Sequence, residues 1–153
     1  MTTTTVERLD EFHGLVGKQI GYSEWQTITQ ERVNLFADAT DDHQWIHVDP
    51  EAAKAGPFGG PIAHGYLTLS LGPVLLQKIL AIPGMTYGIN YGANKVRFPS
   101  PVPVGADLRM GVTVAGAENV ADGVQVVFDL VMEVRDAPKP ACVAQVVYRY
   151  YFD

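Results

Sequence analysis

The chain contains only one cysteine, Cys142, so it cannot form an intrachain disulfide. Cys142 lies within a run of alternating apolar residues, where a free thiol behaves as a small buried side chain. Chains without disulfides are typical of reducing compartments. We therefore expect a structural thiol and a cytoplasmic protein.

The chain also lacks a long uninterrupted apolar segment. Its longest apolar stretch is broken by Gly72, Pro73, Gln77 and Lys78, and residues 1–5 have no basic region followed by an apolar one. A membrane-spanning helix needs about 20 mostly apolar residues, and a secretory signal needs a basic region before its apolar core. We expect neither of these segments, and no membrane partner.

Basic residues are few and scattered. The chain has 11 Lys and Arg against 17 Asp and Glu, a formal net charge of -6. Nucleic-acid-binding proteins gather basic residues on one surface, so no nucleic acid partner is expected. Hydrophobic residues make up 47% of the 153 residues, which is ordinary for a folded protein. The length favours one domain over residues 1–153, with residues 1–17 as an N-terminal helical extension.

The first half of the chain has the apolar spacing of helices. Thr5 can cap a short helix that ends near Gly17, and residues 19–29 alternate unevenly, as in a strand. Thr29 can then cap a helix over residues 30–40. Residues 62–80 are apolar nearly all round, which predicts one enclosed helix with a kink at Gly72-Pro73.

The second half changes to the period of two that strands show. Residues 108–114, 124–134 and 142–152 alternate in this way, residues 85–98 form a further long strand, and turns fall between them. Four consecutive strands with short turns predict an antiparallel meander. With the buried helix, this gives an α+β fold in which the sheet curls around a long central helix. In the predicted strand over residues 124–134, one face carries Val124, Val126, Phe128, Leu130, Met132 and Val134.

A polar cluster between the two predicted helices is the candidate for chemistry. Loops are rich in Asp, and helix termini account for Asp41 and Asp49, the latter capping a helix that starts at Pro50. That account explains less of Asp42 and His47, because the apolar Trp45 and Ile46 between them should turn inward and take these two polar groups out of bulk water. The cluster consists of Asp41, Asp42, His43, His47, Asp49 and His64.

Asp42 and His47 can form a general acid/base pair. A carboxylate and an imidazole that are partly removed from water need partners, and they can supply each other directly or through a shared water. Such a pair transfers protons near neutral pH. A purely structural hydrogen bond between the two side chains stays open as the alternative.

A metal site is the rival interpretation, because His43 and His47 have the i, i+4 spacing of helical metal ligands. The stretch Gln44-Trp45-Ile46, with Pro50 just beyond it, does not support the helical register that this site needs. We therefore expect His43 to face solvent and expect no metal.

The segment that leads into the buried helix offers a backbone donor. Helix starts leave N–H groups unpaired, and Gly65 has no side chain to keep a carbonyl group away. Its N–H can therefore act as an oxyanion hole. The alternative is that the glycines serve only the turn.

Two motifs, Asp42-His43-Gln44-Trp45-Ile46-His47 and Ala63-His64-Gly65, resemble the signature of the MaoC-like (R)-specific enoyl-CoA hydratases. The likeness covers most of the chain from about residue 21, and it is greatest to members related to nodulation protein N. The resemblance implies the hot-dog fold, Asp42 and His47 as catalytic residues and Gly65 as the oxyanion donor. Gln44-Trp45 stands where the family usually has Asn-Pro, and Asp41 where it has Gly. The substrate-binding residues expected from this resemblance are Trp45, His64, Tyr66, Asn94 and Arg97.

The implied reaction is the addition of water to a 2-enoyl thioester, or the reverse, in fatty acid metabolism. The substrate would be carried by coenzyme A or an acyl carrier protein, no cofactor is required, and the family usually forms homodimers. A thioesterase is the first alternative, although residues 62–80 contain no Asp or Glu of the kind such enzymes place on this helix. A non-catalytic acyl-thioester-binding subunit of a two-chain dehydratase is the second.

Overall fold

A computed structural model describes residues 3–152, and its main feature is one curved antiparallel sheet. The long strands alternate apolar and polar residues, so each presents one face to a core and the other to solvent. The predicted α+β class is confirmed. The strands follow the spatial order β2 (Gln19–Tyr22), β6 (Asp107–Val120), β7 (Gly123–Val134), β8 (Cys142–Phe152) and β5 (Met85–Arg97), with β3 (Gln26–Thr27) also paired to β6.

The order of the strands differs from the predicted meander. Strands β6, β7 and β8 are consecutive neighbours as expected, but β5 pairs with β8 at the far side of the sheet and not with β6. The segment 98–106 therefore crosses from one side of the sheet to the other. On its way it binds the chain before α4, through a bridge between Ile62 and Pro103 and a bond from Ala63 N to Val102 O.

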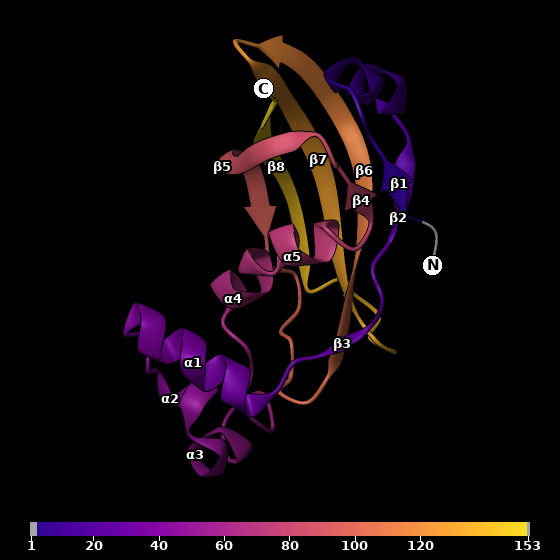
Figure 1. Cartoon of the computed structure of the whole chain (residues 1–153). Coiled ribbons are helices and arrows are strands. Elements are labelled where there is room, and N and C mark those ends of the chain that lie inside the picture. The colour runs from indigo at the N-terminus through magenta and orange to yellow at the C-terminus, as the bar shows by residue number, and fades with distance from the viewer. Residues whose placement is uncertain (1–2, 153) are drawn as a thin grey trace.

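The predicted central helix is shorter than expected and is split into α4 (Gly65–Ser70) and α5 (Gly72–Leu76). Pro73 lies in the first turn of α5, where its ring and missing N–H disrupt the bond to the preceding turn. Both helices lie across the concave face of the sheet (Figure 1). They are enclosed on one side only, because Tyr66, Ser70 and Val74 are exposed along a stripe.

The N-terminal segment also differs from the prediction. Thr5 does not cap a helix, because Thr4–Thr5 form β1, which pairs in parallel with β4 (Leu80–Ala81). A 3-10 helix over Leu9–Leu15 follows, and Arg8 is its N-cap residue. The single strand predicted over 19–29 is two strands, separated by residues 23–25. In this interruption, Ser23 N–H donates to Met110 O and Ser23 Oγ accepts from Met110 N.

The core lies between the concave face of the sheet and α4 and α5. The apolar face predicted for residues 124–134 is buried throughout, and so is Cys142. Burial raises the pKa of the Cys142 thiol to about 11, so the thiol stays protonated. Phe12 stacks on Tyr150 at 5.6 Å and attaches the N-terminal 3-10 helix to this core. No helix within residues 3–152 is long and apolar enough to cross a membrane.

Candidate active site

The site begins where α1 (Gln30–Thr40) ends. Thr29 caps this helix as predicted, accepting a hydrogen bond from Arg32 N, and Asp41 ends it in the left-handed conformation with φ 61. That turn reverses the chain and presents Asp42 on the surface. The Asp42 carboxylate accepts a hydrogen bond from Gln44 N at 3.4 Å.

His47 lies on the short helix α2 (Trp45–Val48) and is 7% exposed. Its Nδ1 is 2.7 Å from the carbonyl oxygen of Ile62, and Gln30 Nε2 donates to the His47 carbonyl at 2.9 Å. The next helix, α3 (Pro50–Lys54), begins with the predicted Asp49 cap on Ala52 N. The helices α1, α2 and α3 gather beyond one end of the sheet, where α4 also begins (Figure 1).

His64 is the N-cap residue of α4 and is 3% exposed. Its ring stacks on His47 with 3.9 Å between ring centroids, and Phe36 covers it at 4.9 Å. Its Nε2 lies 2.9 Å from the Asp42 carbonyl oxygen, and its Nδ1 has no partner within residues 3–152. His64 therefore links the loop that carries Asp42 to the start of α4.

The backbone contacts determine which nitrogen of each neutral imidazole carries its hydrogen. A carbonyl oxygen can only accept, so His47 Nδ1 and His64 Nε2 must be the donors. The lone pairs that remain are on His47 Nε2 and His64 Nδ1. Each of the two buried rings therefore keeps one nitrogen that can accept a hydrogen bond.

Three side chains meet at this point. Asp42, His47 and His64 each offer one oxygen or nitrogen atom, and these atoms lie within 4.8 Å of one another. The Asp42 and His47 side chains form no hydrogen bond with each other: the Asp42 carboxylate accepts from Gln44 N, and His47 Nδ1 contacts the Ile62 carbonyl. The spacing suits one small species held by all three groups, either a water molecule or a metal ion.

His43 does not belong to this group. It is exposed, and its Nε2 lies 2.8 Å from Asp38 Oδ1. The hydrogen bond to Asp38 raises the pKa of His43. The expectation that His43 faces solvent is confirmed, and the spacing of His43 and His47 does not produce a metal pair.

Gly65 is the first residue of α4, next to His64. The N–H groups of a first helical turn have no partner within the helix. A Cβ atom at Gly65 would lie 3.2 Å from the ring of Phe98. The Phe98 ring thus packs closely against the Gly65 backbone, and a larger residue at position 65 would have to displace it.

The remaining residues predicted to bind substrate lie outside the three-residue cluster. Trp45 does not turn inward as predicted; it is 44% exposed, and its ring lies where a Cβ of Gly56 would be. Tyr66 is exposed beside Phe98, with ring centroids 6.1 Å apart. Asn94 donates to Gln145 on β8, and Arg97 donates to the neighbouring Val96 carbonyl.

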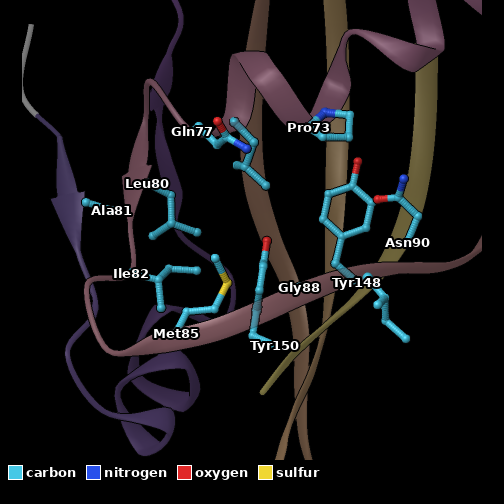
Figure 2. Close-up of a pocket in the computed structure, with 12 residues that line it drawn as sticks. Pro73, Gln77, Leu80, Ala81, Ile82, Met85, Gly88, Asn90, Tyr148 and Tyr150 are labelled. Atoms are coloured by element: carbon cyan, nitrogen blue, oxygen red, sulfur yellow. The ribbon is translucent and has the colours of Figure 1, made fainter. Parts of the chain in front are cut away.

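A cavity of about 370 Å³ lies between α5 and the strands β5 and β8 (Figure 2). It does not include Asp42, His47 or Gly65, and the sequence prediction missed it. The one feature of the sequence that could have pointed to this cavity is a pair of tyrosines two residues apart on the buried face of β8. Its lining consists of Pro73, Leu76, Gln77, Leu80, Ala81, Ile82, Met85, Gly88, Ile89, Asn90, Tyr148 and Tyr150.

Comparison with known proteins decides the family of this chain. The family model described as the MaoC like domain matches residues 11–134. The chain belongs to the MaoC-like family. The resemblance inferred from the two motifs is thereby confirmed, and the chain is an enzyme of the hydratase and dehydratase class.

Individual relatives of this MaoC-like chain cover most of its length. It is 52% identical over 147 residues to 3-hydroxyacyl-thioester dehydratase Z of Mycobacterium tuberculosis, covering 95% of this chain and 97% of the relative. It is 42% identical over 139 residues to nodulation protein N of Rhizobium meliloti, covering 89% and 86%. An R-hydratase structure from Pseudomonas aeruginosa aligns with a TM-score of 0.72 at 25% identity, covering 90% and 83%. These similarities confirm the hot-dog fold.

Proposed function

We propose that this MaoC-like enzyme interconverts trans-2-enoyl thioesters and (R)-3-hydroxyacyl thioesters, carried by coenzyme A or an acyl carrier protein. The observation that carries the proposal is the convergence of Asp42, His47 and His64 within 4.8 Å. The free acceptors on the two imidazoles suit a water molecule, which donates hydrogen bonds. The dehydratase name of the mycobacterial relative supports the same substrate class.

In the hydration direction, the water oxygen bonds to C3 of the substrate. Asp42 accepts the proton that this water releases, while His47 Nε2 accepts a hydrogen bond from the second O–H of the water and fixes its orientation. The Asp42–His47 pair then returns a proton to C2 on the same face. The product gains the two hydrogens and the oxygen of one water, and no cofactor takes part.

Gly65 supplies the complementary electrostatic group. Negative charge develops on the thioester oxygen as C3 is attacked, and an N–H directed at that oxygen stabilises it most in the transition state. A side chain at position 65 would press on the Phe98 ring, so the glycine keeps its backbone free of a side chain beside the proposed path of the thioester. The pantetheine arm would then leave past Trp45, Tyr66, Asn94 or Arg97, all on the exterior.

The cavity beside α5 is the proposed chamber for the acyl chain. Pro73, at its rim, follows Gly65 by eight residues. At a helical rise of about 1.5 Å per residue, Pro73 lies at most roughly 12 Å from the oxyanion donor, because the break between α4 and α5 can only shorten this distance. A medium-length acyl chain spans this distance.

The decisive experiment incubates the purified protein with crotonyl-CoA and, separately, with butyryl-CoA. We expect loss of the enoyl absorbance with crotonyl-CoA and (R)-3-hydroxybutyryl-CoA on chiral analysis. Release of free thiol without loss of enoyl absorbance would identify a thioesterase instead. Protein that is inactive until a second chain is added would favour the binding-subunit alternative.

We also propose that the protein is a homodimer joined through β5. This strand is at the end of the sheet order, and nearly all of its residues are exposed. An edge strand with exposed apolar side chains pairs readily with another chain. Those on β5 are Tyr87, Ile89 and Tyr91, exposed by 42% to 55%.

Light scattering after size exclusion tests this interface. The wild-type protein should have about twice the chain mass of 16.7 kDa. The Tyr91→Glu variant should be a monomer, because it introduces like charges at the join. The matched control, Val131→Glu, changes an exposed residue on the interior strand β7 and should stay dimeric. A monomeric wild-type protein contradicts the proposal.

We place the enzyme in the cytoplasm. The reduced Cys142 and a coenzyme A thioester substrate both support that location.

A further inference from the structure

Tyr148 and Tyr150 lie two residues apart on β8, so their side chains project from the same face of the sheet. Both are only 7% exposed. The ring of Phe128 contacts both tyrosine rings, with centroids 5.7 Å and 6.4 Å away, and Phe12 stacks on Tyr150. These aromatic contacts fix the two rings and hence the direction of their hydroxyl groups.

Both hydroxyl groups point into the cavity toward α5, as Figure 2 shows. A Cβ at Gly72 would lie 3.2 Å from Tyr148 Oη, so the glycine leaves room for this hydroxyl. Neither hydroxyl forms a hydrogen bond with any side chain or backbone group of residues 3–152. Burial raises the pKa of Tyr148 to about 12 and that of Tyr150 further, so both remain neutral donors.

Two hydroxyl groups without a hydrogen-bond partner in residues 3–152 are unexpected in a cavity that binds a plain hydrocarbon chain. A hydrocarbon chain that fills the cavity would take water away from both hydroxyls and offer no hydrogen bond in return, whereas phenylalanine at these positions would lose nothing. The other lining side chains are mostly aliphatic, with the amides of Gln77 and Asn90 as the polar exceptions. No lining residue carries a charge, so an ionised ligand group would have no counter-ion here.

We propose that the acyl group of the substrate carries an uncharged oxygen, a hydroxyl or keto group, that accepts hydrogen bonds from Tyr148 and Tyr150. This inference rests on the proposed hydratase function and on the cavity as its acyl chamber. The two tyrosines act as specificity residues: they replace the water that such an oxygen loses on entering the cavity. A saturated hydrocarbon tail leaves both hydroxyls unpaired and is the poorer substrate.

The test compares pairs of trans-2-enoyl-CoA substrates of equal carbon number, one with an alkyl end and one with a terminal hydroxyl, from hexenoyl to dodecenoyl. An apolar cavity prefers the alkyl member, because the hydroxyl must shed water. We expect the reverse: at one chain length the hydroxylated member has a kcat/KM about tenfold higher. The ratio within a pair is the readout, since effects common to both members cancel.

The variants Tyr148→Phe and Tyr150→Phe, singly and together, should move that ratio toward the alkyl substrate. Tyr151→Phe is the matched control, because Tyr151 stacks on Tyr87 and does not line the cavity. A wild-type ratio that favours the alkyl member at every length overturns the inference, whether or not the variants fold. Crotonyl-CoA is too short to reach the tyrosines, so its hydration tests the proposed function separately.

Discussion

The Asp42→Asn and His47→Ala variants should each hydrate crotonyl-CoA at least about a hundredfold more slowly than the wild-type protein. A hundredfold corresponds to about 2.7 kcal/mol of transition-state stabilisation. Asn keeps the shape of the Asp42 side chain but cannot take up the water proton. Alanine at position 47 removes the Nε2 acceptor. Steady-state loss of enoyl absorbance measures both effects.

The control for these variants is His43→Ala. His43 belongs to the same loop but is exposed and bonded to Asp38, so this variant should keep near-wild-type turnover. Circular dichroism should show that all three proteins fold. Full activity in Asp42→Asn would refute its role as the base. Inactivation by a chelator, with recovery on adding zinc, would mean that the three-residue cluster holds a metal ion instead of water.

The Gly65→Pro variant should lose about a hundredfold or more in kcat, because proline removes the N–H proposed to stabilise the enolate oxygen. Proline is well tolerated at the first position of a helix. The preceding residue, His64, has φ -61 and ψ 138, an extended conformation that a following proline favours. The loss of kcat should therefore come from the missing N–H, and the variant should still fold.

Gly65→Ala separates the donor from the space around it. Alanine keeps the N–H but adds a Cβ 3.2 Å from the Phe98 ring, which is 41% exposed and free to shift. Its loss of kcat should be clearly smaller than that of Gly65→Pro. Equal losses in the two variants would mean that the missing side chain matters and the N–H does not.

Several local features of the fold were predictable from the sequence because they depend on neighbouring residues, although the cap predicted at Thr5 was wrong. Thr29 and Asp49 cap helices as expected, and the alternation around Phe128 identified the buried face of β7. Contacts between distant segments were not predictable in this way. The period of two locates β5 as a strand but does not tell which strand it pairs with.

The same limit applies to the site. The motifs indicated Asp42 and His47, but the stacking of His64 on His47 joins residues 17 apart, and the spacing gives no sign of it. Trp45 looked like an inward anchor because it is apolar, yet it packs on Gly56 and stays half exposed. In the sequence, Tyr148 and Tyr150 look like ordinary strand residues. Only the structure shows that their hydroxyl groups face a cavity (Figure 2).

Main-chain oxygens orient both buried imidazoles: His47 is held by the carbonyl of Ile62, and His64 by the carbonyl of Asp42. A carbonyl group is present whatever the side chain at its residue. Position 62 can therefore change its side chain without removing the acceptor that aligns His47. The orientation of His47 is thus independent of the side chain at position 62, and substitutions there would leave the proposed proton-transfer site in place.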